Sequence, residues 1–299
     1  MFYRPKASFI QQLSCNLDVN GVAICDHRIF LTGISSQALE VFDANSYLLL
    51  QTLAVQGMTD PWDIAARPSN PYLYVFEGLY QILRLDLNGK IVTSWTLDGS
   101  QRSLSVSRRN SVVVTYSDRL EEFDNVGKIL RSIKLDKAIY NASHSVILGT
   151  DIFLVCHELG QRSDSHQLCL VDSDSRIVVR HNGPSGSIYQ PVHLAVADHA
   201  CVLVADIHNR RVQIFADNLS HSYDLFSSRH FWPLRVSYDR PRGNAYITTL
   251  DGKVLVYCVR ARNSPYTECL NVHSGLITGQ LTDMHCDALD ATTTSEMEE

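Results

Sequence analysis

The sequence has no apolar run as long as the roughly 18 residues from which membrane-spanning helices begin. It has no C-x-x-C pair, which argues against zinc ribbons and thioredoxin-type chemistry. The nucleophile elbow, the H-E-x-x-H motif, the phosphate-binding loop and the dinucleotide fingerprint are missing as well. The first 14 residues lack the basic-then-apolar layout of a signal peptide. These absences predict a protein without a membrane partner and without a common catalytic motif.

The eight cysteines show no regular spacing that would indicate a disulfide framework. Most of them sit in apolar, strand-like runs, where a cysteine behaves as a small hydrophobe: Cys25, Cys156, Cys169, Cys201 and Cys258. This usage favours a reducing compartment, and we expect the cytoplasm. Secretion stays open as the alternative, because Asn141-Ala-Ser and Asn218-Leu-Ser are formal glycosylation sequons.

Charge is scarce and unevenly distributed. The formal net charge is −6, yet no lysine or arginine follows residue 262 and several acids do, so residues 1–262 are close to neutral. A dedicated nucleic-acid or membrane binder is usually strongly basic. The end of the chain is acidic and poor in large apolar groups, which predicts a disordered tail over residues 263–299.

What the sequence does contain is an internal repeat. The segment Pro191 to Phe226 has four short apolar runs of strand character, separated by polar turn residues. The same order starts again near residues 21, 61, 101, 143 and 232, and nothing in it has a helical period. The third run ends on an aspartate in five of the six units, at Asp43, Asp86, Asp124, Asp172 and Asp217.

This marker recurs about every 42 residues, the length of a four-stranded propeller blade. The sixth unit lacks its fourth run, and Ala7 to Leu13 is a candidate to replace it. We therefore predict an all-β fold, a six-bladed β-propeller of antiparallel four-stranded blades over residues 15–262. Residues 1–14 supply the strand that closes the ring and leaves no long edge exposed.

The fifth unit resembles the NHL repeat. The resemblance rests on Pro-x-x-Leu-Ala-Val from Pro191, Val-Leu-Val-Ala-Asp ending at Asp206, and Asn209-Arg210-Arg211-Val-Gln-Ile-Phe. It is fair in the second and sixth units and weak in the others. It implies a six-bladed propeller in which Asp206, Asn209 and Arg211 have structural roles. NHL propellers often end tripartite-motif ubiquitin ligases and RNA-binding repressors, although this sequence has no zinc-spaced cysteine set and no heptad run.

The first strand of each propeller blade lines the central channel. Aligning the units predicts a ring of channel residues, namely Gly21, Asp63, Ser103, Ser145, His193 and Arg235, with His144 as the alternative in the fourth unit. The polar members Asp63, His193 and Arg235 are the candidate site. They either bind an anion or a polar group, or they bond to one another and to channel water.

The enzymatic alternative is a metal-dependent lyase, similar to the peptide-amidating lyase, with zinc in the channel. A catalytic zinc needs three protein ligands, and the ring offers one histidine, or two with His144. The other histidines, His157 among them, are interpreted as turn or loop positions. Asp63 and His193 come from opposite blades, which predicts a separation too large for one ion, and the Arg235 cation opposes a metal. We therefore expect no transition metal, no cofactor and no enzymatic activity, while calcium, which takes oxygen ligands in a looser geometry, stays open.

A weakly basic surface is the remaining candidate. Arg229, Arg240 and Arg242, with Arg235, fall among aromatic residues near the end of the predicted propeller, and such groups can grip phosphates and stack on bases. The excess of positive charge is small. The sequence therefore predicts a monomeric, non-catalytic recognition scaffold for a protein partner, with RNA as the alternative partner and, from the NHL resemblance, a place in ubiquitin ligation or post-transcriptional regulation.

Overall fold

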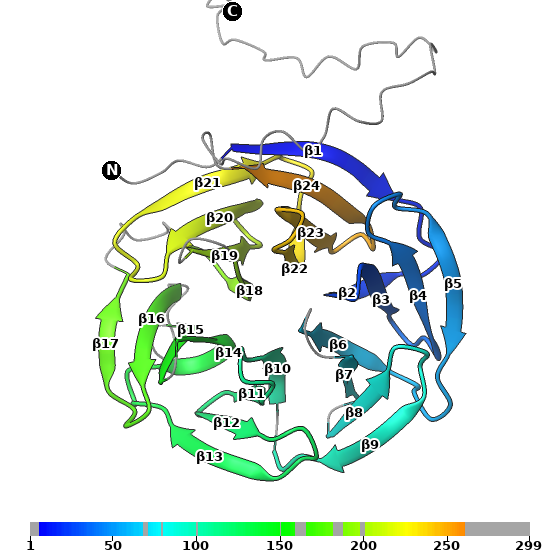
Figure 1. Ribbon diagram of the computed structural model, residues 1–299. Helices are drawn as coiled ribbons and strands as arrows, with labels where there is room; N and C mark the ends of the chain where they lie inside the picture. The colour runs from blue at the N-terminus through cyan, green and yellow to red at the C-terminus, as the bar shows by residue number, and fades with distance from the viewer. Residues whose placement is uncertain are drawn as a thin grey trace, which may run out of the picture. The chain divides into compact units, whose positions relative to one another are not determined.

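The computed structural model describes residues 6–67, 71–78, 80–99, 101–149, 151–158, 166–181, 188–197 and 201–260. The regular structure in these ranges consists of 24 strands in six four-stranded antiparallel sheets. The sheets surround a common centre like the blades of a propeller (Figure 1). The predicted six-bladed β-propeller is thus confirmed. The tail predicted over residues 263–299 lies outside the described residues.

Blades 1 to 3 follow one another along the chain, each running from the centre outward. Blade 1 contains β2 (Val19–Cys25), β3 (Arg28–Gly33), β4 (Ala38–Asp43) and β5 (Leu49–Ala54). Blade 2 contains β6 (Pro61–Ala66), β7 (Tyr72–Glu77), β8 (Gln81–Asp86) and β9 (Ile91–Thr96). Blade 3 contains β10 (Gln101–Val106), β11 (Val112–Tyr116), β12 (Arg119–Phe123) and β13 (Ile129–Lys134).

Blades 4 to 6 complete the ring, and the last takes its outer strand from the start of the chain. Blade 4 contains β14 (Tyr140–Leu148), β15 (Ile152–Glu158), β16 (His166–Asp172) and β17 (Ile177–Arg180). Blade 5 contains β18 (Pro191–Val196), β19 (Cys201–Asp206), β20 (Arg211–Ala216) and β21 (Ser222–Ser227). Blade 6 contains β22 (Pro233–Asp239), β23 (Asn244–Thr249), β24 (Val254–Arg260) and β1 (Lys6–Leu13).

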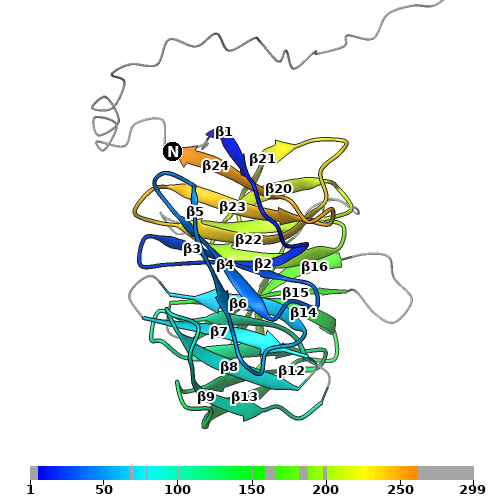
Figure 2. The same cartoon turned by 90° about the vertical axis from the view of Figure 1, so that its right-hand side faces the viewer.

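The strand β1 closes the ring. It pairs antiparallel with β24, from Lys6 opposite Arg260 to Leu13 opposite Val254. Leu13 is 2% exposed and joins the apolar cluster between blades 6 and 1. Figure 2 shows β1 lying along β24 at one side of the ring. The closing strand predicted over Ala7 to Leu13 is confirmed, and it satisfies the backbone edge that β24 would otherwise expose.

The aspartates that marked the end of each third run lie at the turn between the third and fourth strands. The Oδ1 atom of Asp86 accepts the backbone N–H groups of Asn88 and Lys90, each at 2.9 Å. Equivalent turn bonds are made by Asp43, Asp124 and Asp172. The recurring aspartate is therefore explained by its side chain, which satisfies turn amides that no strand pairs.

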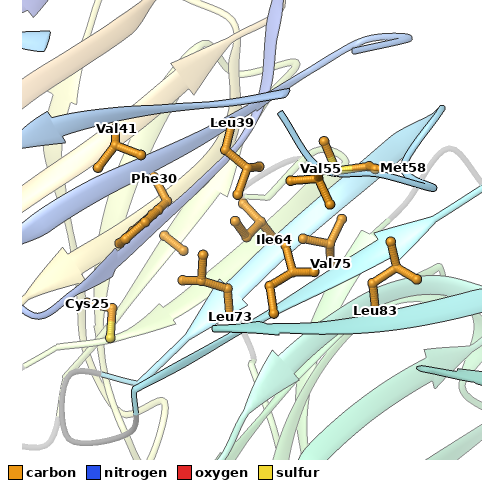
Figure 3. Close-up of a cluster of buried hydrophobic side chains, with 12 residues drawn as sticks. Cys25, Phe30, Leu39, Val41, Val55, Met58, Ile64, Leu73, Val75 and Leu83 are labelled. Atoms are coloured by element: carbon orange, nitrogen blue, oxygen red, sulfur yellow. The ribbon is translucent and has the colours of Figure 1, made fainter. Parts of the chain in front are cut away.

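Apolar side chains fill the interfaces between neighbouring blades. Between blades 1 and 2, Phe30 and Leu39 pack with Ile64 and Leu73, and none of the four is more than 3% exposed (Figure 3). The other five interfaces carry equivalent clusters. Burial of each large apolar side chain contributes about 1.5–3 kcal/mol, so these contacts lock the blades, and with them the channel strands, in place.

The NHL-like motif of blade 5 forms a buried ion pair. Arg211 Nε donates to Asp206 Oδ2 at 3.0 Å, and the Asn209 amide donates to the same oxygen at 2.9 Å. Asp206 Oδ1 accepts the Tyr189 N–H at 2.9 Å, which ties the turn to the connection that precedes β18. These contacts bear out the structural role predicted for the motif. No helix among the described residues is long and apolar enough to cross a membrane.

Candidate functional site

The innermost strand of every blade has a register irregularity at a corresponding place. A β-bulge adds a residue and re-aims the side chain that follows it. The residues directly after the six irregularities are Gly21, Asp63, Ser103, His144, His193 and Arg235. This is the predicted ring with one change: His144, the alternative, takes the fourth position. Ser145 instead hydrogen-bonds Thr115 of blade 3, with 2.8 Å between the two hydroxyl oxygens.

Asp63 is the charged centre of the ring and is 1% exposed. Its Oδ1 atom accepts Arg235 Nε at 3.2 Å and the Ile64 N–H at 3.0 Å, while Oδ2 lies 3.5 Å from the Leu104 nitrogen. Burial raises the pKa of Asp63, and the Arg235 charge and the backbone amides counteract this. The predicted polar ring thus contains a buried ion pair.

Glycine in blade 1 makes that ion pair geometrically feasible. Blade 1 lies between blades 6 and 2, and its ring position is Gly21. A Cβ atom there would stand 2.3 Å from Thr32 Oγ1 and 3.0 Å from Ile64 Cγ2. Since Gly21 presents no side chain, Arg235 of blade 6 reaches past it to Asp63 of blade 2. Arg235 Nη2 also donates to the Trp62 carbonyl at 3.4 Å.

Two histidine rings lie in contact, tilted relative to each other, on the other side of the ring. The ring centroids of His144 and His193 are 4.0 Å apart. His144 is fully buried, and neither of its nitrogens has a hydrogen-bond partner of good geometry among the described residues. Burial and the Arg235 charge lower the pKa of His144 to about 3, although a weak backbone contact with Leu104 opposes the shift. Burial, followed by the charges of His144 and Arg235, also holds the pKa of His193 well below its usual value. Both imidazoles are therefore neutral near pH 7.

The separation predicted between Asp63 and His193 was wrong. Although they come from opposite blades, His193 Nε2 lies 3.9 Å from Asp63 Oδ2. With His144, they present three possible ligand atoms that all lie within 4.8 Å of one another. The innermost strands converge at the centre (Figure 1), and the 3.9 Å separation shows that side chains of opposite blades meet there. The distance between Asp63 and His193 therefore does not exclude a metal ion shared by the two residues.

The predicted basic surface is divided by the fold. Arg229 lies in the connection before β22, whereas Arg240 and Arg242 follow the other end of β22. Arg242 is engaged: Nη1 donates to Asp239 Oδ2 at 2.9 Å, and Nη2 to Asn45 Oδ1 of blade 1 at 2.8 Å. Arg240 Nη2 donates to the Ala197 carbonyl of blade 5 at 3.3 Å. Two of the three arginines thus join blade 6 to its neighbours, and the three do not form one patch.

The sequence interpretation missed four exposed apolar residues at the end of the blades where the innermost strands begin. In an antiparallel blade, the second-to-third-strand connection lies at the end where the first strand begins. Ile34, Tyr80 and Leu250 occupy these connections in blades 1, 2 and 6, and Trp62 is the second residue of β6. Their exposed fractions are 57%, 57%, 61% and 49%, respectively. We call these four residues the entrance patch.

Backbone bonds tie the entrance patch to the start of the channel strands. The Ile34 N–H bonds to the Asp18 carbonyl at 2.9 Å, and the Leu250 N–H bonds to the Trp232 carbonyl at 2.9 Å. The strand β2 contacts both β22 and β6, so blades 6, 1 and 2 are consecutive. The entrance patch is thus attached beside β6 and β22, the strands that carry Asp63 and Arg235.

The fold and this central cluster define a six-bladed β-propeller with a buried carboxylate–histidine–arginine centre. The sequence matches no protein-family model and no curated protein. Among solved structures, the chain is similar to hydrazine synthase of Kuenenia stuttgartiensis, with a TM-score of 0.59 and 12% sequence identity over 83% of this chain and 98% of that chain. That likeness establishes the shared propeller fold.

Proposed function

We propose that the protein is a recognition scaffold that binds a protein partner through the entrance patch. The observation that carries the proposal is the exposure of four large apolar side chains at one end of three consecutive blades. Isolated exposed hydrophobes are common, but grouped ones on a rigid surface are typical of protein-binding sites. Tryptophan and tyrosine are also the residues that most often dominate binding energy.

The NHL resemblance of blade 5 supports the same role, because propellers of that family recognise proteins or RNA. RNA is the less favoured partner here, since Arg229 is separated from Arg240 and Arg242 by the length of β22. We place the scaffold in the cytoplasm as a monomer. In support, Cys15, Cys156, Cys169 and Cys258 carry free thiols, which a reducing compartment preserves. Ubiquitin ligation and post-transcriptional regulation are the pathways that the resemblance suggests.

Site-specific photo-crosslinking in cells tests the proposal. A photoreactive phenylalanine analogue at Tyr80 is expected to give one discrete protein adduct, which mass spectrometry identifies. The matched control is the same analogue at Leu48 of blade 1, whose side chain is 67% exposed. Leu48 lies in the connection between β4 and β5, at the end of the blade opposite the entrance patch. The double substitution Ile34→Ser and Leu250→Ser should remove the adduct. Equal adducts from both positions, or an adduct with RNA, would refute the protein-binding entrance patch.

A further inference from the structure

The cluster of Asp63, His144 and His193 has a composition that suits a metal ion. One carboxylate oxygen and two imidazole nitrogens lie within 4.8 Å of one another, and they project from β6, β14 and β18. Nitrogen ligands favour first-row transition metals, whereas magnesium and calcium prefer oxygen. Two histidines and a carboxylate also form the set found in many three-ligand zinc and iron sites.

His144 supplies an independent observation that points to a ligand. A buried polar side chain without a partner loses its hydration and gains nothing in exchange, at a cost of about 1–3 kcal/mol. Such groups are rare in folded proteins and call for an explanation, such as a bound ion or water. Both nitrogens of His144 are buried without a good hydrogen bond among the described residues. An ion at the centre of the cluster would satisfy one of them.

The distances need only a small adjustment. Zinc binds nitrogen and oxygen at about 2.0–2.2 Å, so ligand atoms in a tetrahedral site lie about 3.3 Å apart. His193 Nε2 and Asp63 Oδ2 are 3.9 Å apart. Because Arg235 Nε occupies the Oδ1 side of the carboxylate at 3.2 Å, Oδ2 is the oxygen left for an ion. Binding therefore requires side-chain rotations that bring the three ligand atoms, which lie within 4.8 Å of one another, to that spacing.

We propose that Asp63, His144 and His193 bind one divalent transition metal ion, with zinc as the best-fitting species. Three protein ligands leave a fourth position for water. The inference does not depend on the proposed entrance patch, since the cluster lies within the ring and a partner could bind with or without the ion.

Metal binding requires His193 to change its tautomer. Its Nδ1 atom now accepts the Val236 N–H at a long 3.4 Å, which places the ring proton on Nε2. Coordination through Nε2 moves this proton to Nδ1 and gives up that contact. The tautomer of His193 therefore changes on loading, which nitrogen NMR detects without any assay of activity.

The test is equilibrium dialysis of the full chain against zinc, followed by elemental analysis. We expect one zinc per chain, and at least ten-fold weaker binding for His144→Gln and for His193→Gln. His157→Gln is the matched control, because His157 is a buried histidine of the same blade outside the cluster; it should keep the zinc. Melting each metal-free variant shows whether it is folded.

His144→Gln is expected to stay folded, because His144 makes no good hydrogen bond among the described residues that the substitution would remove. A loss of zinc in this variant therefore reports on metal binding. Cobalt supplies a second readout: the parent should show the visible absorption bands of a low-coordinate site, and His144→Gln should not. The proposal is overturned if zinc does not bind stoichiometrically. It is equally overturned if zinc binds as tightly to His144→Gln and His193→Gln as to the parent, because the ion would then lie elsewhere.

Discussion

Asp63 and Arg235 lie 172 positions apart in the chain, yet the Arg235 guanidinium bonds to the Asp63 carboxylate inside the ring at 3.2 Å. This contact joins blade 2 to blade 6 past the glycine of blade 1. It neutralises the one carboxylate among the six ring positions. It also places a permanent positive charge beside the proposed metal ligands.

Arg235→Gln should therefore have two opposite effects. Without metal, the Asp63 carboxylate loses its counter-charge and the free energy of unfolding falls by about 3 kcal/mol. The affinity for zinc should rise at least about ten-fold, because a divalent ion no longer faces the guanidinium. Thermal melting and zinc dialysis of the same sample measure both effects. A variant that binds zinc more weakly than the parent would show that Arg235 aids metal binding by orienting Asp63.

Ring closure depends on β1. Deleting residues 1–14 removes the strand that pairs with β24 and the Leu13 side chain, so we expect aggregation or a large fall in melting temperature. A pair of point variants separates packing from pairing. Leu13→Ala should cost about 2–4 kcal/mol through the cavity it leaves. Ile10→Ala, at a side chain that is 38% exposed, should cost less than about 1 kcal/mol. Equal losses would argue against the burial of Leu13.

His157 should make stability depend on pH. Burial lowers its pKa, as do the nearby charges of Arg180 and His166, although the Glu158 carbonyl opposes the shift. The unfolded chain therefore binds a proton below about pH 6.5 that the folded chain refuses. The free energy of unfolding is therefore not reduced by His157 above that pH, and it falls as the pH drops toward the pKa of His157 in the folded chain. Between the unfolded and the folded pKa, the free energy of unfolding should therefore fall less steeply with decreasing pH in His157→Gln than in the parent, by at most about 1.4 kcal/mol per pH unit. Melting curves from pH 7 to 5 test this, and parallel slopes would contradict it.

Two glycines with left-handed backbones should respond differently to alanine. Gly127, at φ 92°, sits against Trp95 of blade 2, and a Cβ atom would lie 2.6 Å from Trp95 Cγ. Gly149, at φ 70°, has no described atom within 4 Å of that position. Gly149→Ala should cost about 1 kcal/mol of backbone strain, and Gly127→Ala about 2–4 kcal/mol, since overpacking adds to the strain. Chemical denaturation of both variants compares them; a similar cost would show that Trp95 moves aside freely.

The fold could be predicted from the sequence because its signals are local. Each turn aspartate, such as Asp86, satisfies amides within four residues, so its repetition marks every blade without knowledge of the ring. The closing strand was predictable for a related reason: six blades need a set number of strands, and one was missing. Both inferences require only the order of elements along the chain.

The centre of the ring could be predicted only in part. His144 was left as an alternative because β14 breaks register over a longer stretch than the other inner strands, between Tyr140 and His144. The contact between Asp63 and His193 depends on the width of the channel, which no local pattern encodes. His157, interpreted from the sequence as a turn residue, is buried in β15. The entrance patch was missed because single apolar residues in turns have no periodicity.

The pairing of β1 with β24 also sets the order of events when the chain is made. Lys6 is synthesised before its partner Arg260, which follows all the other strands that the structure describes. Until then β1 has no strand to pair with, and the ring of blades is not closed. Pairings between distant parts of a chain form slowly and leave partly folded states exposed to aggregation. In a nascent chain the edge that β1 covers therefore stays unpaired until β24 is complete.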